Sequence, residues 1–130
     1  MTMNQQKKIV IVDDDDRNIF ALNAVLKSKG YLCLSTTSPY EGLEILRQQN
    51  DIGVALIDMM MPGMDGYEMI NAIRNDEKIS DLPVIAVTAQ AMAGDREKCL
   101  ETGASDYVSK PINIDLLLNM LNQHLPNVNH

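Results

Sequence analysis

The sequence contains two cysteines, no tryptophan and no long run of apolar residues. Two cysteines do not make the disulfide framework of a small secreted protein, so we expect Cys33 and Cys99 to be reduced and buried as small hydrophobic residues. No stretch approaches the roughly 20 apolar residues that a transmembrane helix needs. The apolar run from Ile9 to Val12 is also too short for a secretory signal, because Asp13 ends it. These absences predict a cytoplasmic protein with no membrane partner.

Basic residues are few as well. The chain has 11 lysines and arginines against 18 acidic residues, and its formal net charge of -7 repels nucleic acids and anionic lipids. We therefore expect no nucleic-acid partner for this domain. A length of 130 residues with 45% hydrophobic composition is enough to bury one core of ordinary size. Because no repeat or linker interrupts the chain, we expect one domain over residues 1–130.

Short β-branched segments alternate with segments of helical periodicity along the whole chain. The strands are predicted at residues 8–12, 31–36, 54–57, 84–87 and 107–109. The first, third and fourth are apolar at nearly every position, which is typical of strands covered on both faces. Repeated β-α units of this length imply a parallel sheet with right-handed crossovers and helices on both sides. The predicted fold class is a doubly wound α/β domain.

Capping residues indicate where the helices begin and end. Gly30 and Gly103 lie where a left-handed residue would end a helix. Two helices should begin with a capped first turn in which a glutamate can complete a capping box, at Ser38-Pro39-Tyr40-Glu41 and Asp65-Gly66-Tyr67-Glu68. The last helix carries an apolar stripe at spacings of three and four that should face the core, made of Ile114, Leu117, Leu118, Leu121 and Leu125.

Polar and charged residues follow the predicted strands, where the functional groups of open α/β sheets gather. Asp13 to Asp16 follow the first strand, Asp58 the third, Thr88 the fourth and Lys110 the fifth. A run of four aspartates is usually a solvated loop, with Asp16 here as a helix N-cap. That interpretation suits Asp15 and Asp16. Asp13 and Asp58 directly continue buried strands, so their carboxylates begin near the interior.

The carboxylates of Asp13, Asp14 and Asp58 favour a divalent cation. If the first and third strands are neighbours, their ends lie about 5 Å apart, and the charges of Asp13 and Asp58 repel. A hard cation with oxygen ligands relieves that repulsion, and Mg2+ or Mn2+ suits carboxylates better than Zn2+ does. Without the cation, repulsion and partial burial should raise the pKa of at least one of these carboxylates.

The functional groups predicted around Asp58 are those that phosphoryl transfer to a carboxylate requires. Asp58 offers a carboxylate nucleophile, Lys110 a cation and Thr88 a hydroxyl group, beside the expected metal. Transfer through an aspartyl phosphate depends mostly on positioning and charge neutralisation, which this set supplies. The residues therefore point to phosphorylation of Asp58.

The chain resembles the response-regulator receiver domains of two-component signalling. The resemblance spans nearly the whole chain and is carried by four motifs in family order, IVIVDDDDRN, ALIDMMMPGMDG, VIAVTA and DYVSKPI. It implies a flavodoxin-like (βα)5 fold with five parallel strands in the order 2-1-3-4-5. It also implies that Asp58 is the phosphoacceptor, that Thr88 and Lys110 contact the phosphoryl oxygens, and that the metal ligands are Asp13, Asp14, Asp58 and the backbone carbonyl of Met60.

Further expectations come from the same resemblance. Thr88 and Tyr107 occupy the positions of a coupled switch that rearranges on phosphorylation, and the Lys110-Pro111 peptide should be cis. Two positions depart from the chemotaxis receivers: Met60 offers no polar side chain to the attacking water, whereas Gln90 is able to position one. These opposite effects leave the lifetime of the phosphorylated state open. The segments DRNIFAL and TAQAMAGDREKCLETGASDYVSKPI look like those of receivers attached to, or working beside, hybrid histidine kinases.

The expected partner is a histidine kinase or phosphotransfer protein that supplies the phosphoryl group from a phosphohistidine. The domain would catalyse its own phosphorylation and dephosphorylation without acting as an enzyme on an external metabolite. Leu116 and Met120 form a second apolar strip on the last helix, which belongs either to rim packing or to a homodimer or partner face made by the fourth helix, fifth strand and fifth helix.

Sequence features distinguish three alternative functions from a phosphorylated receiver domain. A flavin- or nucleotide-binding module of similar fold needs a Gly-, Ser- or Thr-rich phosphate loop after the first strand, where this chain has aspartates. A haloacid-dehalogenase-type phosphohydrolase needs a second aspartate two residues past its nucleophile, where Met60 stands. A degenerate receiver would have lost the acceptor, a metal acid or the lysine, and this chain keeps all three.

Overall fold

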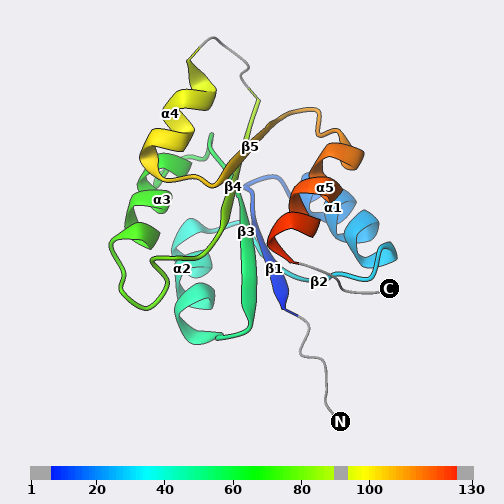
Figure 1. Cartoon of the computed structure of the whole chain (residues 1–130), viewed down its shortest axis with the longest axis horizontal. Coiled ribbons are helices and arrows are strands. Elements are labelled where there is room, and N and C mark those ends of the chain that lie inside the picture. The colour runs from blue at the N-terminus through cyan, green and yellow to red at the C-terminus, as the bar shows by residue number, and fades with distance from the viewer. Residues whose placement is uncertain (1–6, 90–93, 126–130) are drawn as a thin grey trace.

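The computed structural model describes residues 7–89 and 94–125 and contains one five-stranded sheet (Figure 1). All neighbouring strands pair in parallel, in the order β2-β1-β3-β4-β5. The strands are β1 (Lys8–Val12), β2 (Leu32–Thr36), β3 (Ile52–Asp58), β4 (Val84–Thr88) and β5 (Asp106–Ser109). The helices between and after them are α1 (Asp16–Ser28), α2 (Pro39–Gln48), α3 (Gly66–Arg74), α4 (Asp95–Thr102) and α5 (Ile114–His124). The predicted doubly wound α/β fold and strand order are confirmed.

Helices cover both faces of the sheet, with α2, α3 and α4 on one side and α1 and α5 on the other (Figure 1). Successive side chains of a strand point to opposite faces, so Val10 and Val12 of β1 pack under the first group of helices while Ile9 and Ile11 pack under the second. Burial on both faces explains why the inner strands are apolar throughout. In the apolar stripe of α5, Leu117 is fully buried, and Leu121 and Leu125 are buried beside it.

Most of the predicted helix ends are confirmed. Gly30 and Gly103 have φ angles of 93° and 127°, as left-handed C-terminal residues require. The capping box of α3 is complete, with Asp65 and Glu68 each accepting a hydrogen bond from the other's backbone N–H. At α1 the sequence prediction was wrong by one residue. Asp15 is the N-cap, because its carboxylate accepts the N–H of Arg17, and Asp16 is the first helical residue.

The box predicted at the start of α2 is only half formed. Ser38 caps the helix and accepts the N–H of Glu41 at 3.2 Å. The Ser38 N–H donates instead to the hydroxyl of Thr36, and that hydroxyl donates to the Glu41 carboxylate. Thr36 is the last residue of β2, and its hydroxyl bridges Ser38 and Glu41, the two residues of the expected capping box. These hydrogen bonds connect the start of α2 to the end of β2.

The two cysteines are free thiols, as expected. Cys99 is fully buried between α4 and the sheet, whereas Cys33 of the edge strand β2 is only half-buried. Burial raises the pKa of the Cys33 thiol to about 11, so the reactive thiolate is scarce at neutral pH. Among residues 7–89 and 94–125, no helix combines the length and apolar character that crossing a membrane requires.

Candidate functional site

The register of the sheet brings the predicted site residues to one edge. Val12 pairs with Ile57, so Asp13 and Asp58 follow neighbouring positions of β1 and β3. Asp58 pairs with Val87, which places Thr88 next along β4. Thr88 in turn pairs with Ser109, and Lys110 follows it. Parallel strands that end at the same edge therefore gather residues far apart in the sequence.

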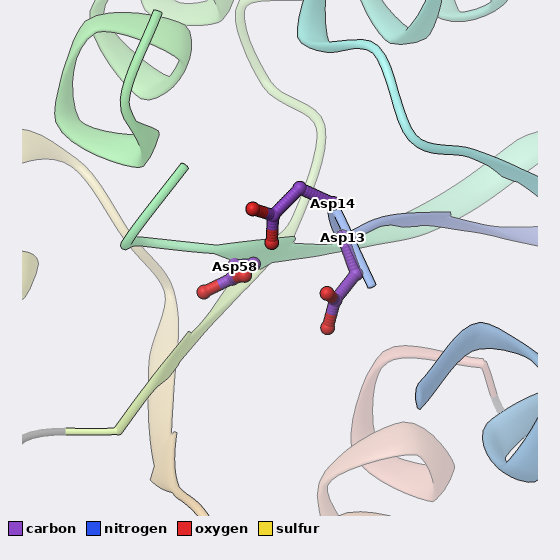
Figure 2. A group of neighbouring side chains, drawn as sticks. All are labelled: Asp13, Asp14 and Asp58. Atoms are coloured by element: carbon purple, nitrogen blue, oxygen red, sulfur yellow. The ribbon is translucent and has the colours of Figure 1, made fainter. Parts of the chain in front are cut away.

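Three carboxylates form an acidic cluster at this edge (Figure 2). One oxygen from each of Asp13, Asp14 and Asp58 lies within 4.8 Å of the others. Asp13 and Asp58 are only 4% exposed, and Asp14 is exposed. Hard oxygen donors without histidine or cysteine fit Mg2+ or Mn2+ and exclude a typical zinc ligand set. The cluster is therefore able to bind a divalent metal ion.

Lys110 faces two of these carboxylates. Its Nζ lies 3.4 Å from Asp13 Oδ2 and 3.7 Å from Asp58 Oδ2. The peptide bond between Lys110 and Pro111 is cis, as the resemblance implied. Asp58 Oδ1 accepts the backbone N–H of Met60 at 3.0 Å, which holds one oxygen of the carboxylate toward the loop after β3.

Burial raises the pKa of Asp58 to about 6, and the negative charges of Asp13 and Asp14 add to the rise. The Met60 N–H and the Lys110 ammonium act in the opposite direction. The prediction that the pKa of at least one carboxylate of the cluster is raised is confirmed for Asp58. The main cause of the rise is burial, with charge repulsion second, because the end of β3 is enclosed by protein.

The loop after Asp58 is shaped by a close approach of α3. A Cβ atom on Gly66 would lie 2.6 Å from the Cα of Met59 and 3.0 Å from the carbonyl oxygen of Asp58. Glycine at this position therefore lets the capped end of α3 pack directly against the end of β3. Met59 and Met61 are buried in the core, whereas the side chain of Met60 is 51% exposed.

Thr88 and Tyr107 lie at different depths. Thr88 ends β4 and is 5% exposed. Tyr107 of β5 is half-buried and packs against the core beneath α2, α3 and α4. Gln90, which the sequence singled out beside Thr88, lies outside the described residues.

Sequence reasoning missed Asn18. Its side-chain amide donates to Asp13 Oδ2 at 3.4 Å from the first turn of α1. The sequence signal that could have revealed it is the spacing of five residues between Asp13 and Asn18. At this spacing, a side chain in the first turn of a helix lies close to the end of the preceding strand.

The fold and site together define a doubly wound domain with an acidic cluster of two buried carboxylates and one exposed carboxylate, faced by a lysine, at the carboxyl edge of its sheet. The family model for the response regulator receiver domain matches residues 9–122. A relative from Brucella ovis, the polar-differentiation response regulator DivK, is 32% identical over 92% of this chain and 96% of its own.

Solved structures show the same likeness. A response regulator receiver protein from Pseudomonas putida aligns with a TM-score of 0.86 at 26% identity, over 93% of this chain and 99% of its own. The receiver domain of a sensor histidine kinase from Pseudomonas aeruginosa PAO1, with a magnesium ion coordinated in its active-site cleft, aligns with a TM-score of 0.84 at 31% identity, over 95% and 100%.

The chain belongs to the response regulator receiver domain family. It is a phosphoacceptor signalling switch of a two-component system, a class that in general is not enzymatic. Membership favours this function over the phosphohydrolase and the flavin- or nucleotide-binding alternatives. Receiver domains work with histidine kinases or phosphotransfer proteins, and this class of partner applies here.

Proposed function

We propose that Asp58 is the phosphoacceptor and that its phosphorylation depends on Mg2+, with Mn2+ able to replace it. The main support for this proposal is that the Asp58 carboxylate, at the end of β3, lies close to two other carboxylates and to the Lys110 ammonium. Asp13, Asp14, Asp58 and the backbone carbonyl of Met60 would hold the cation. When bound, the cation neutralises charge on the carboxylates and on the incoming phosphoryl group.

The chain's own residues supply the remaining steps. A carboxylate oxygen of Asp58 attacks the phosphorus of a phosphohistidine, and an O–P bond forms as the P–N bond breaks. The bonding electrons leave on the imidazole nitrogen, which takes a proton from solvent. Lys110 and the hydroxyl of Thr88 bind the phosphoryl oxygens and hold them as the charge shifts. Burial of Asp58 excludes most bulk water from its carboxylate.

Phosphorylation then changes the position of Thr88, and Tyr107 follows it. The surface that responds is made of α4, β5 and α5, which we propose as the face for a homodimer or an output partner. Residues 1–130 act as one receiver domain in the cytoplasm, beside a histidine kinase or phosphotransfer protein. The likeness to a Pseudomonas aeruginosa receiver that is itself a domain of a sensor histidine kinase supports the proposal that this chain is a receiver of the hybrid histidine kinase type.

The test is to incubate the protein with Mg2+ and a small phosphodonor and to locate added phosphate by mass spectrometry. We expect one phosphate on Asp58, and no stable addition in excess EDTA. Asp58→Asn should stay unmodified under the same conditions. The control is Asp51→Asn, because Asp51 pairs with Lys8 at the opposite end of the sheet and should not affect labelling. Full labelling of Asp58→Asn, or labelling of wild type in EDTA, would contradict the proposal.

A further inference from the structure

The Asp13 carboxylate is held by donors from three places. The Asp15 N–H donates to Oδ1 at 2.8 Å. The Asn18 amide donates to Oδ2 at 3.4 Å, and Lys110 Nζ donates to the same oxygen at 3.4 Å. A carboxylate offers about four lone-pair positions, so these three donors leave room for one more ligand. Asp13 is thus oriented before any cation arrives.

Of the two donors to Oδ2, Lys110 has a competing task. Its Nζ already lies between Asp13 and Asp58, 3.4 Å from one carboxylate and 3.7 Å from the other. The proposed function requires this ammonium at the phosphoryl group on Asp58. Asp13 is 4% exposed, so water does not readily replace a donor that leaves. A buried carboxylate that loses a hydrogen-bond donor is destabilised, and its orientation then depends on the donors that remain.

Asn18 is suited to hold Asp13 throughout the reaction. Its own N–H donates to the Asp15 carbonyl at 3.1 Å, inside the first turn of α1. The next residue, Ile19, is buried against the sheet and fixes that turn. An amide is neutral, so it orients the carboxylate without competing electrostatically with a cation, as a lysine or arginine would.

We propose that Asn18 is a positioning residue that keeps Asp13 oriented as a metal ligand, above all when Lys110 turns to the phosphoryl group. This inference rests on the proposed function and adds a residue to it. Groups that orient metal ligands from behind change metal affinity by about 10–100-fold when they are replaced. The single amide contact at 3.4 Å belongs at the lower end of that range.

The experiment replaces the amide by an apolar group of similar size, Asn18→Leu. The matched control is Asn23→Leu, because Asn23 lies on the same helix and its amide also donates at 3.4 Å, but to Ser35 Oγ. Calorimetry measures the Kd for Mg2+ with no phosphodonor present. We expect the Kd of Asn18→Leu to rise about tenfold and that of Asn23→Leu to change less than about twofold. Asn18→Ala replaces the leucine variant if thermal melting in EDTA shows that the latter does not fold.

A second readout separates positioning from general damage. The rate of labelling by a small phosphodonor is measured as a function of the Mg2+ concentration. For Asn18→Leu we expect the half-saturating concentration to rise about tenfold, with a smaller change in the rate at saturation. A loss of folded protein would lower the rate at every Mg2+ concentration and leave the midpoint unchanged.

The two proposals fail in different ways. An unchanged Kd for Mg2+ in the folded Asn18 variant, an equal change in Asn23→Leu, or no Mg2+ binding to wild type would overturn the role of Asn18. Wild-type protein that binds Mg2+ but takes no phosphate on Asp58 would overturn the proposed function. In that case the calorimetric comparison still decides whether Asn18 positions Asp13.

Discussion

Replacing Asp58 by asparagine should stabilise the metal-free fold at neutral and alkaline pH. In wild type, the carboxylate of Asp58 is ionised there despite its burial and despite the neighbouring charges of Asp13 and Asp14. The variant Asp58→Asn keeps the size of the side chain and an oxygen that can accept the Met60 N–H. It removes the charge. The gain in stability therefore measures the strain of the ionised carboxylate.

The size of this gain follows from the pKa of Asp58. In the fold it is about 6, against an ordinary value of 3.8. Each pKa unit corresponds to about 1.4 kcal/mol of difference between the two protonation states. The ionised carboxylate therefore lowers the free energy of unfolding by roughly 3 kcal/mol in the absence of metal. For a chain of this size, that gap corresponds to about 10 °C in Tm.

The pH dependence has a definite sign. Because the pKa of Asp58 is raised in the fold, the native state binds its proton more tightly than the unfolded chain does. The resulting stabilisation is complete below the unfolded value of 3.8 and is lost as pH rises through about 6. The protonated carboxyl group and the asparagine amide are both neutral, so wild type and Asp58→Asn should have nearly equal stability at about pH 4.

The assay is urea and thermal unfolding of both proteins in EDTA, at about pH 4 and about pH 8. We expect a gap of roughly 3 kcal/mol at the higher pH that closes toward the lower one. Saturating Mg2+ should narrow the gap at the higher pH, since a cation that binds only the folded state stabilises wild type. Asp51→Asn serves as the control and should show no such gain. An Asp58→Asn variant no more stable than wild type at alkaline pH in EDTA would refute the argument.

Two further predictions concern the switch and the packing of α4. Thr88→Ala should still bind a beryllium fluoride mimic of the phosphoryl group at Asp58, but Tyr107 should no longer move, because the Thr88 hydroxyl that couples Tyr107 to the site is gone. NMR spectra of the Tyr107 ring with and without the mimic measure this movement. A full spectral shift in the variant would refute the coupling. Arg74→Met should lower the free energy of unfolding by about 3 kcal/mol, because the guanidinium donates to the carbonyls of Gly103, Ser80 and Leu82 and leaves them unpaired when removed. Urea unfolding measures this loss, and Arg47→Met is the control, since Arg47 pairs with Asp76 near the surface and its loss should change stability by less than about 1 kcal/mol.

Much of this protein could be predicted from sequence, because the informative features are local. A strand buried on both faces needs apolar residues at every position, and a helix end needs a capping side chain, so both leave marks within a few residues. Parallel strands end at one edge of a sheet. For that reason the positions of Asp13, Asp58, Thr88 and Lys110 after their predicted strands placed them at one edge, and the strand order implied by the family resemblance made them neighbours.

Tertiary structure decided what the local pattern left open. It determined that Asp15 caps α1 while Asp13 enters the site, although the two look alike in a run of four aspartates. It also determined that Lys110 is shared between two carboxylates, and that Asn18 reaches Asp13. The physical reason is that burial and hydrogen bonding depend on residues distant along the chain: Lys110 and Asp13 are 97 positions apart, and only packing of the whole sheet sets the distance between them.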